Sequence, residues 1–291
     1  MTKTFEYIKA NGVTLYVLKA GPETGRLVIL LHGFPEFWYG WRNQIEFFAN
    51  AGYCVWIPDQ RGYNLSEKPV GVAAYNLDNL AADVVGLIDA ASRDKAIVIG
   101  HDWGAAVAWR VANQYPQRVE RLVILNVPHP VVMGRALKRN RRQQLRSWYI
   151  FFLLIPWLPE RVARLWNWKL LVQMLMSSSR PGTFTDSDLD YYREAWSQPH
   201  AFRSMSNWYR AMMQTASVRL ASQRITVPTL MLWGVKDIAL GRELAQPSIN
   251  LCDDGKLEFF DQASHWVHHE ESERVNNLIV EFLRVDSSRD V

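Results

Sequence analysis

The residues best suited to chemistry lie in segment 100–104, whose sequence Gly-His-Asp-Trp-Gly has the pattern Gly-x-Asp-x-Gly. The apolar run 96–99 precedes it, and a helical pattern begins near Ala105. Small residues on both sides allow a strand to turn sharply into a helix, so that Asp102 is presented at the tip of the turn. Serine is the more usual residue at such a tip, so an aspartate there indicates a less common reaction.

Asp102 is suited to act as a nucleophile without the help of a base. Its carboxylate, with a reference pKa of about 3.9, is ionised at neutral pH, and the positive end of the following helix favours that charge. A carboxylate suits displacement at an sp³ carbon that bears a leaving group, whereas its attack on a peptide or ester is futile because the better leaving group returns. In the alternative interpretation, Asp102 only caps the helix that starts near Trp103, but this does not explain the flanking glycines.

An ester on Asp102 needs a base for its hydrolysis, and the C-terminal part of the chain contains candidates. His265 follows the apolar run 256–260, and a histidine with a pKa near neutrality can take a proton from water. It needs an orienting acid, and Asp237 follows a strand pattern that ends at Gly234, although a turn or helix cap would also account for it. The alternatives are His268 and His269 for the base, expected at a helix entry or on the surface, and Asp253 and Asp254 for the acid.

Short apolar runs alternate with helical patterns, which indicates parallel strands connected by helices. The predicted strands are 14–20, 26–31, 53–58, 96–100, 121–125, 227–234 and 256–260, and the predicted core helices are 41–49, 77–91, 105–114 and 271–283. The candidate motifs follow the ends of predicted strands, and ligand sites of open α/β sheets lie at that edge.

The pattern changes after the predicted strand 121–125: from there to about residue 223 no buried strand is predicted and aromatic residues are frequent. We therefore expect a core formed by 1–130 and 224–291, interrupted by an all-helical cap over 131–223. The most apolar segment, 148–157, is shorter than the ~20 residues of a membrane-spanning helix, so we expect a buried wall there. The basic run 135–146 is expected to be a solvated helix face.

Composition and charge exclude several classes of protein. The chain has 291 residues, of which 48% are hydrophobic, so it can bury a full core and is not a disordered sequence. Its formal charge of +4 is too weak to indicate a nucleic-acid partner. Cys54 and Cys252 give no disulfide framework and are expected to be reduced core residues of a cytoplasmic protein. The first residues contain no apolar segment typical of a signal peptide.

Taken in order along nearly the whole chain, these motifs resemble the α/β-hydrolase family and, within it, the epoxide hydrolases. The resemblance rests on His-Gly-Phe-Pro at 32–35, segment 100–104, Trp-Gly-Val-Lys-Asp at 233–237, Ser-His-Trp at 264–266, and Tyr149 and Tyr209 in the cap. It implies an α/β-hydrolase fold, with a mostly parallel eight-stranded sheet, helices on both faces and an inserted helical cap. The chain order of nucleophile, acid and histidine agrees with this fold.

The resemblance also implies the remaining groups of the site. Backbone N–H groups of Phe34 and Trp103 would form an oxyanion hole for the tetrahedral intermediate. The peptide bond between Phe34 and Pro35 would be cis, and the turn 60–63 would be structural. The side chains expected to contact the substrate are those of Phe34, Trp103, Tyr149, Tyr209 and Trp266.

The leaving group distinguishes the two leading activities. A halide leaves as an anion and needs only weak donors such as an indole N–H, and Trp103 also occurs in haloalkane dehalogenases. An epoxide leaves as an alkoxide and needs an acid such as tyrosine, with a pKa of about 10. Tyr149 and Tyr209 match the two lid tyrosines of epoxide hydrolases, although a single tyrosine in an aromatic segment is more often a packing residue. Phe34 favours the same activity, because dehalogenases commonly have Asn or Glu there.

We therefore expect an epoxide hydrolase that converts a lipophilic epoxide and water into a vicinal diol, through an ester on Asp102 that His265 and Asp237 hydrolyse. No metal or organic cofactor is expected. The alternatives are a haloalkane or haloacid dehalogenase with the same nucleophile, and a non-catalytic small-molecule-binding protein. We expect a monomer or homodimer that binds no nucleic acid and does not insert stably into a membrane. The natural substrate, its stereochemistry, and a role in detoxification, catabolism or signalling stay open.

Overall fold

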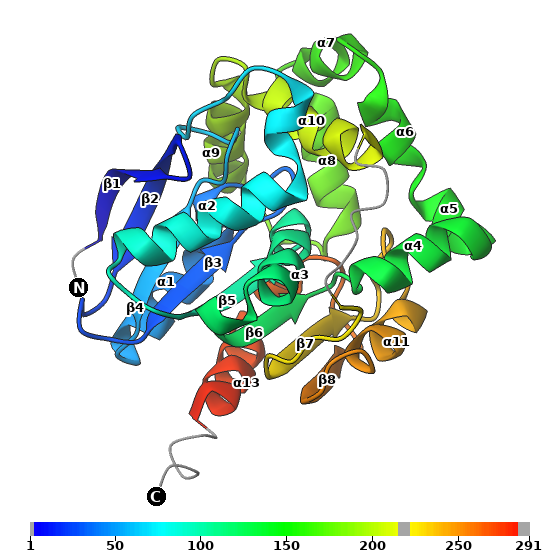
Figure 1. Cartoon of the computed structure of the whole chain (residues 1–291). Helices are drawn as coiled ribbons and strands as arrows, with labels where there is room; N and C mark the ends of the chain where they lie inside the picture. Colours follow the sequence, from blue (N-terminus) through cyan, green and yellow to red (C-terminus); the bar gives the residue numbers. More distant parts are fainter. Residues whose placement is uncertain (1–2, 215–221, 285–291) are drawn as a thin grey trace, which may run out of the picture.

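The computed structural model describes residues 3–214 and 222–284. Eight strands form one sheet in the order β1-β2-β4-β3-β5-β6-β7-β8 (Figure 1). The strands are β1 (Thr4–Ala10), β2 (Val13–Ala20), β3 (Leu27–Leu31), β4 (Cys54–Pro58), β5 (Ala96–His101), β6 (Val119–Leu125), β7 (Thr229–Gly234) and β8 (Gly255–Phe260). β2 pairs antiparallel with both β1 and β4, and the other neighbouring strands pair in parallel. The predicted fold class, with a mostly parallel eight-stranded sheet, is confirmed.

Helices cover both faces of this sheet, because its central strands are apolar on both sides. The core helices are α1 (Arg42–Asn50), α2 (Leu77–Ala90), α3 (Trp103–Gln114), α11 (Ala245–Ile249), α12 (Val267–Glu270) and α13 (Ser272–Arg284). Leu27, Ile29 and Leu31 of β3 belong to the hydrophobic cluster that contains α2 and α3. Val28 and Leu30, on the opposite side of the same strand, belong to the cluster that contains α1 and α13. The alternation of side chains along a strand therefore produces the three layers.

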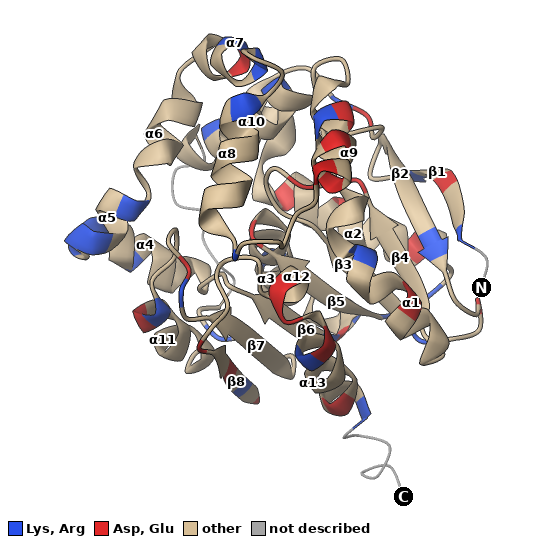
Figure 2. Ribbon diagram, turned by 180° about the vertical axis from the view of Figure 1, so that it is seen from behind, with Lys and Arg blue, Asp and Glu red and all other residues tan. Residues whose placement is uncertain are grey.

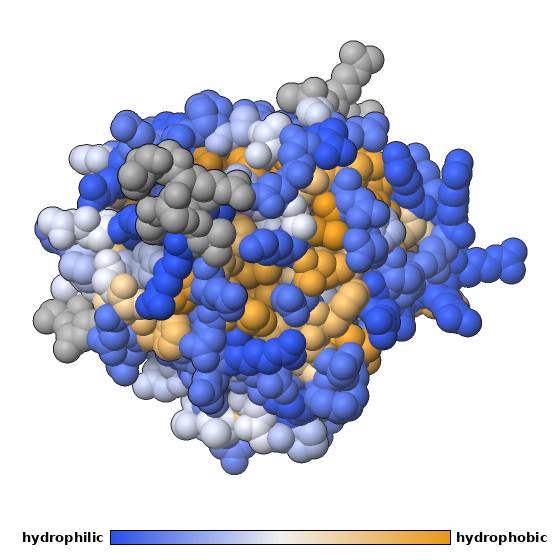
Figure 3. Space-filling view, turned by 90° about the horizontal axis from the view of Figure 1, so that it is seen from below, coloured by the Kyte–Doolittle hydropathy of each residue, from blue (hydrophilic) through white to orange (hydrophobic). Residues whose placement is uncertain are grey.

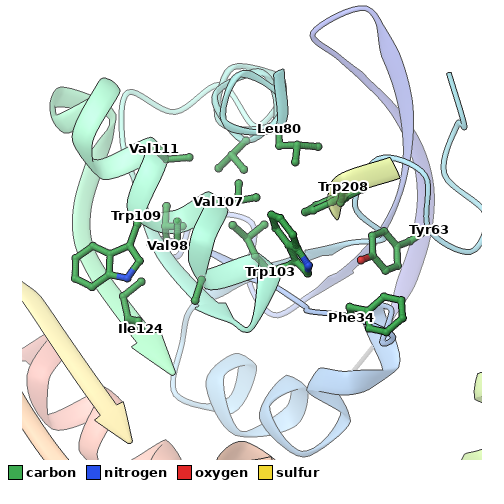
Figure 4. Close-up of a cluster of buried hydrophobic side chains, with 14 of the residues drawn as sticks. Phe34, Tyr63, Leu80, Val98, Trp103, Val107, Trp109, Val111, Ile124 and Trp208 are labelled. Atoms are coloured by element: carbon green, nitrogen blue, oxygen red, sulfur yellow. The ribbon is translucent and has the colours of Figure 1, made fainter. Parts of the chain in front are cut away.

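The layer of α2 and α3 holds the turn that contains Asp102. Val98 of β5 and Ile124 of β6 pack with Val107 of α3, and Trp103 and Trp208 extend the cluster toward the cap (Figure 4). Burying a large apolar side chain stabilises a fold by roughly 1.5–3 kcal/mol. The end of β5 and the start of α3 are therefore held by the core, and the turn between them has little freedom to move.

Among the strands of the described residues, β1 is the one that the pattern of the sequence did not predict. Most of its side chains are exposed, so it lacks the apolar run of a central strand. Phe5 and Tyr7 instead contact Tyr16 of β2, with ring centroids 5.3 and 5.0 Å apart. An edge strand of this kind is stabilised by its neighbour, which a local pattern does not report.

The elements that the described residues form between β6 and β7 are helices, as predicted for the insertion after the sixth strand, and Ile225 makes an isolated β-bridge with Cys252. The seven helices are α4 (Pro130–Arg139), α5 (Arg141–Arg146), α6 (Trp148–Leu154), α7 (Leu158–Arg164), α8 (Lys169–Ser178), α9 (Asp186–Ser197) and α10 (Ala201–Gln214). Figures 1 and 2 show them at one end of the sheet. The domain boundaries at 130/131 and 223/224 stay predictions.

The expectation that segment 148–157 forms a buried wall is wrong. Ile150 and Leu153 are buried, but Trp148, Phe151 and Trp157 are 67%, 65% and 71% exposed. The physical reason is that α6 is a short helix at the outside of the cap, so only one of its faces meets the rest of the protein. The neighbouring basic run is a solvated helix face, as predicted. None of the helices within the described residues combines the length and apolar character needed to cross a bilayer.

The end of the molecule opposite the cap carries a surface cavity. The lower face shows apolar residues surrounded by hydrophilic ones (Figure 3). A cavity of about 580 Å³ lies between α1 and α13 and is lined by residues that include Phe47, Val280 and Arg284. No cap residue and none of the candidate catalytic residues lines this cavity, so it is not the site that the motifs indicate. Cys54 and Cys252 are free and buried, as expected.

Candidate active site

The site is built around Asp102, which connects β5 to α3 with φ 49° and ψ −124°. A non-glycine residue in such a region costs roughly 1–3 kcal/mol and persists where its surroundings hold it. Two glycines allow the close packing: a Cβ at Gly104 would lie 2.0 Å from the carbonyl oxygen of Leu31, and a Cβ at Gly33 would lie 2.2 Å from the Cβ of Asp102. The glycines around Asp102 therefore serve a tight turn and a close backbone approach.

The Asp102 carboxylate is held between two predicted site residues. Its Oδ1 accepts a hydrogen bond of 2.7 Å from the backbone N–H of Phe34, and its Oδ2 lies 3.5 Å from Nε2 of His265. Burial raises the pKa of Asp102, but the hydrogen bond and charge of His265 outweigh it, so that the pKa falls below its usual value. Asp102 is therefore ionised at neutral pH, as a carboxylate nucleophile must be.

His265 and Asp237 form a buried pair with this carboxylate. His265 Nδ1 and Asp237 Oδ2 are 2.7 Å apart, and because an ionised carboxylate only accepts, Nδ1 carries the proton. Burial lowers the pKa of His265, but the charges of Asp237 and Asp102 and their hydrogen bonds raise it to about 10. Burial likewise raises the pKa of Asp237, and His265 lowers it below its usual value. The structure thus brings Asp102, His265 and Asp237 together in hydrogen-bond order.

Asn126 is a site residue that the sequence interpretation missed. It directly follows β6, and its Nδ2 donates to Asp237 Oδ2 at 2.8 Å while its Oδ1 accepts from the N–H of Gly234 at 2.9 Å. Asp237 Oδ1 also accepts from the N–H groups of Ala239 and Leu240. The available signal was a polar residue at the end of a buried strand, at the same sheet edge as the other motifs.

The two predicted tyrosines come from different cap helices and lie together. Tyr149 on α6 and Tyr209 on α10 have ring centroids 6.2 Å apart, with an interplanar angle of 81°. Tyr209 also packs edge to face on Trp103, at 5.0 Å. Burial is the largest cause that raises the pKa of both tyrosines above their usual value, and the charge of Asp102 contributes to both shifts. Both hydroxyls are therefore protonated at neutral pH, and both lie close enough to Asp102 for its charge to affect their pKa.

Other aromatic side chains form the walls around these groups. The ring of Phe34 lies 5.5 Å from that of Tyr209, and the Phe34–Pro35 peptide bond is cis. The ring of Trp266 is perpendicular to that of His265 at 5.1 Å, and its indole N–H donates to Ser178 Oγ of α8 at 2.9 Å. The contacts that were predicted between Phe34, Trp103, Tyr149, Tyr209, Trp266 and a substrate stay predictions.

The turn 60–63 has the structural contacts that were expected of it. Arg61 forms a buried ion pair with Asp83, and its carbonyl accepts from the indole N–H of Trp208 at 3.0 Å. The turn also brings Tyr63 close to the site, where burial and the charge of Asp102 raise the pKa of its hydroxyl. Within the described residues this hydroxyl has no hydrogen-bond partner. Tyr63 is therefore a second site residue that the sequence interpretation did not identify.

A buried cluster around Glu36 joins the cap to the core beneath His265. Glu36 Oε1 accepts from the hydroxyl of Tyr192 on α9 at 2.6 Å and lies 2.8 Å from Nε2 of His269. His101 Nε2 is 2.9 Å from the carbonyl oxygen of His265. His268 and His269 lie in α12, so their predicted place at a helix entry is confirmed, but both are buried and the alternative of a surface position is wrong.

The same cluster is the group within the described residues whose spacing suits a metal ion. Glu36, His268 and His269 offer ligand atoms within 4.8 Å of one another. However, Arg42 Nη1 donates to His269 Nδ1 at 3.1 Å, so a neutral His269 carries its proton on Nε2 and donates it to Glu36. That nitrogen has no lone pair for a metal, and a guanidinium beside the ring opposes a cation. The geometry is that of a hydrogen-bonded junction.

The buried pair of His265 and Asp237 leads us to expect a specific dependence of stability on pH. Asp237 has a lowered pKa, so its contribution is present above the unfolded value of about 3.9 and is lost as the pH falls through its folded pKa. His265 has a raised pKa, so its contribution is present below about 6.5 and is lost as the pH rises toward its folded value. The loss of Tm in Asp237→Asn should therefore be largest between about pH 4 and 6.5 and shrink on both sides.

Thermal melts of wild type and Asp237→Asn across this pH range measure the effect. Asp253→Asn is the matched control, because Asp253 forms an exposed ion pair with Arg224, and such pairs contribute little. A pH-independent difference in Tm between wild type and Asp237→Asn would contradict the coupling of the two titrations.

Comparison with known proteins agrees with the geometry. Residues 26–272 match the alpha/beta hydrolase fold family. The AB hydrolase superfamily protein YfhM of Bacillus subtilis is 47% identical over 279 residues, which cover 96% of this chain and 97% of that protein. Epoxide hydrolase 1 of Caenorhabditis elegans is 38% identical over 283 residues, which cover 95% of this chain and 69% of that protein.

Solved structures of epoxide hydrolases have the same fold. The Bacillus megaterium epoxide hydrolase in complex with an inhibitor aligns with a TM-score of 0.87 and 30% identity, over 96% of this chain and 99% of that chain. Epoxide Hydrolase A from Mycobacterium thermoresistibile aligns with a TM-score of 0.88 and 31% identity, over 97% and 98%. The chain therefore belongs to the α/β-hydrolase fold family, and its resemblance to the epoxide hydrolases of that family is confirmed.

Proposed function

We propose that this protein is an epoxide hydrolase that converts a lipophilic epoxide and water into a vicinal diol. The observation that carries the proposal is the pair of protonated tyrosines, Tyr149 and Tyr209, packed beside the elbow that holds the ionised Asp102. A carboxylate nucleophile with two hydroxyl donors suits an electrophile whose leaving group stays attached and needs a proton. The epoxide hydrolases among the relatives support the same activity.

In the first step, Tyr149 and Tyr209 donate hydrogen bonds to the epoxide oxygen. An Asp102 oxygen attacks a ring carbon, the carbon–oxygen bond of the ring breaks, and one tyrosine gives its proton to the alkoxide. The product is a hydroxyalkyl ester on Asp102. Tyr209 is buried and Tyr149 is partly buried, which limits competition from water donors and strengthens the hydrogen bonds to the developing alkoxide.

In the second step, His265 activates water to attack the carbonyl carbon of the ester. Ester formation removes the negative charge of Asp102, so one of the two carboxylates that raise the pKa of His265 is lost. The imidazolium can then lose its proton, which returns to the tyrosinate left by ring opening. The neutral imidazole then accepts a proton from water, oriented by Asp237. The N–H groups of Phe34 and Trp103 stabilise the oxyanion, and collapse of the tetrahedral intermediate releases the diol.

The rest of the chain has supporting roles in this proposal. Residues 131–223 form the cap that supplies the tyrosines, and 1–130 with 224–291 form the core that supplies the nucleophile, base and acid. The aromatic walls, including Phe34 and Trp103, favour a lipophilic substrate. The cytoplasmic location and the monomeric or homodimeric state stay predictions.

The proposal is tested by the products formed from a panel of aryl, terminal and fatty-acid epoxides and of haloalkanes. We expect the epoxides to be converted to diols, and we expect the haloalkanes to release halide much more slowly. In a single turnover with excess protein in ¹⁸O-labelled water, the diol should contain unlabelled oxygen, because the oxygen comes from Asp102, while the label enters the protein. Halide release as the main activity would favour a dehalogenase. Binding without turnover of any compound would favour a non-catalytic protein.

A further inference from the structure

One outer face of the cap carries exposed apolar side chains at a regular spacing. Leu145 lies on α5, Trp148 and Phe151 lie on α6, and Ile155 directly follows α6, at intervals of three, three and four residues. Leu145 is 74% exposed, Trp148 67% and Phe151 65%. Trp157, directly after this run, is also exposed. We call these five residues the outer cap stripe.

The segment that contains the outer cap stripe is strongly basic. Residues 130–178, from the start of α4 to the end of α8, contain nine Lys and Arg and a single acidic residue, a formal charge of +8 in a chain whose total is +4. The acidic residue, Glu160, is already paired with Arg210 of α10. Lys and Arg gather on α4 and α5, next to the stripe, while acidic residues are prominent on α9 (Figure 2). The charge of the cap is therefore asymmetric.

The outer cap stripe lies on the reverse side of a helix that faces the site. Ile150 and Leu153 of α6 are buried, and Tyr149 is partly buried, whereas Trp148 and Phe151 point to solvent. The backbone carbonyl of Ile155 accepts from Arg210 Nη2 at 2.7 Å, which attaches the end of this segment to α10, the helix that carries Tyr209. A surface in contact with the stripe would thus lie against α6, the helix that carries Tyr149. Helix α6 in turn packs on α10, which carries Tyr209.

We propose that the outer cap stripe docks the protein on the surface of an anionic phospholipid membrane. Exposed Trp and Phe at the edge of a helix with Arg and Lys beside them suit the boundary between acyl chains and negatively charged headgroups. The aromatic rings enter the headgroup boundary and the basic side chains contact the phosphates, without any segment crossing the bilayer. A lipophilic substrate dissolved in that membrane would then reach the cap over a short path.

The charge of the segment makes a second copy of the chain a less favourable partner for the outer cap stripe than an anionic membrane. A twofold interface would place the same surface patch of each copy against the other, so that two segments of formal charge +8 would meet. Like charges that face each other destabilise an interface. An anionic bilayer offers the opposite charge together with an apolar layer.

The experiment is sedimentation of the purified full chain with vesicles. Vesicles of phosphatidylcholine with roughly a third phosphatidylglycerol carry a negative surface potential, and vesicles of pure phosphatidylcholine do not. We expect binding to the anionic vesicles, weakened by raising NaCl from about 0.05 to about 0.5 M, since salt screens exposed charges. Trp148→Ser with Phe151→Ser should weaken this binding at least about tenfold.

Two matched controls distinguish binding through the outer cap stripe from nonspecific binding to vesicles. Tyr7→Ser with Val70→Ser removes exposed apolar side chains outside the outer cap stripe and should bind as wild type does. Arg141→Glu with Arg142→Glu should weaken binding to anionic vesicles, whereas Lys9→Glu with Lys256→Glu, at exposed positions outside the cap, should change it less. Circular dichroism should be unchanged in all of these variants, because every altered side chain is exposed. Tm should also be unchanged, except that the Tyr7 variant loses the ring contact with Tyr16 and should melt at a slightly lower temperature.

Three results would overturn the proposal. The first is the absence of wild-type binding to anionic vesicles at low salt. The second is an equal effect of the cap variants and their controls. The third is a wild-type dimer in analytical ultracentrifugation that Trp148→Ser with Phe151→Ser converts to a monomer, which would assign the stripe to a second copy. Since none of these measurements uses epoxide turnover, their outcome is independent of the proposed activity.

Discussion

Replacing His265 with Gln is expected to stop the reaction at a covalent ester on Asp102 and to reduce kcat roughly 10²–10⁴-fold, the range of general base catalysis. The carboxylate attack needs no base, because the pKa of Asp102 is below its usual value and the nucleophile is already ionised. Water, by contrast, needs a proton acceptor, and the side-chain amide of Gln is not one. The first step should therefore proceed and the second should stop.

The trapped ester is measured by mass spectrometry. Incubation of His265→Gln with an epoxide should add the full mass of that epoxide to the protein, and digestion should locate it on the peptide that contains Asp102. His200→Gln is the matched control, because His200 is exposed and outside the site, and it should turn over without accumulating adduct. Wild-type kcat in His265→Gln, or an adduct on another residue, would refute the assigned roles.

The second large effect is expected from Tyr149→Phe combined with Tyr209→Phe, which should nearly abolish ring opening. Removing both hydroxyls leaves the alkoxide without a proton donor, and general acid catalysis contributes roughly 10²–10⁴-fold. Either tyrosine can donate to the same oxygen, so each single variant should lose less than the double variant. The rings remain, and with them the packing of Tyr209 on Trp103 and Phe34.

Single-turnover rates of ester formation measure this effect directly. Tyr191→Phe is a suitable control, because this exposed tyrosine lies on cap helix α9 and is not part of the site. The double variant also separates the two chemistries, since a halide leaves without a proton and its release should survive. Ring opening at the wild-type rate in the double variant would show that another group, such as the nearby Tyr63, supplies the proton.

Much of the core, and the turn that contains Asp102, could be predicted from short stretches of sequence. Central strands such as β3 are apolar on both sides, because helices cover both faces of a parallel sheet. Gly33 and Gly104 are needed because a Cβ at either position would collide with atoms of the turn or its neighbours. These are local requirements of backbone and side-chain size, so they appear directly in the residue pattern.

The parts that were missed depend on contacts between distant segments. β1 is recognisable only through its pairing with β2. Asn126 became a site residue because parallel strands β6 and β7 place it against Asp237, 111 positions along the chain. His268 and His269 are buried because Glu36, more than two hundred residues earlier, lies beside them. The polarity of a residue does not indicate whether its side chain will be buried against a hydrogen-bond partner from a distant part of the sequence.

The motifs around Asp102, His265 and Asp237, the strand–helix order and the helical nature of the cap follow from local patterns, because glycine geometry and side-chain periodicity act over a few residues. The meeting of Tyr149 and Tyr209, which are 60 positions apart and on different helices, required the packing of α6 on α10. The same packing decided which side of segment 148–157 is buried. One helix face can contact the core and the other is left to solvent, a choice that an apolar run does not encode.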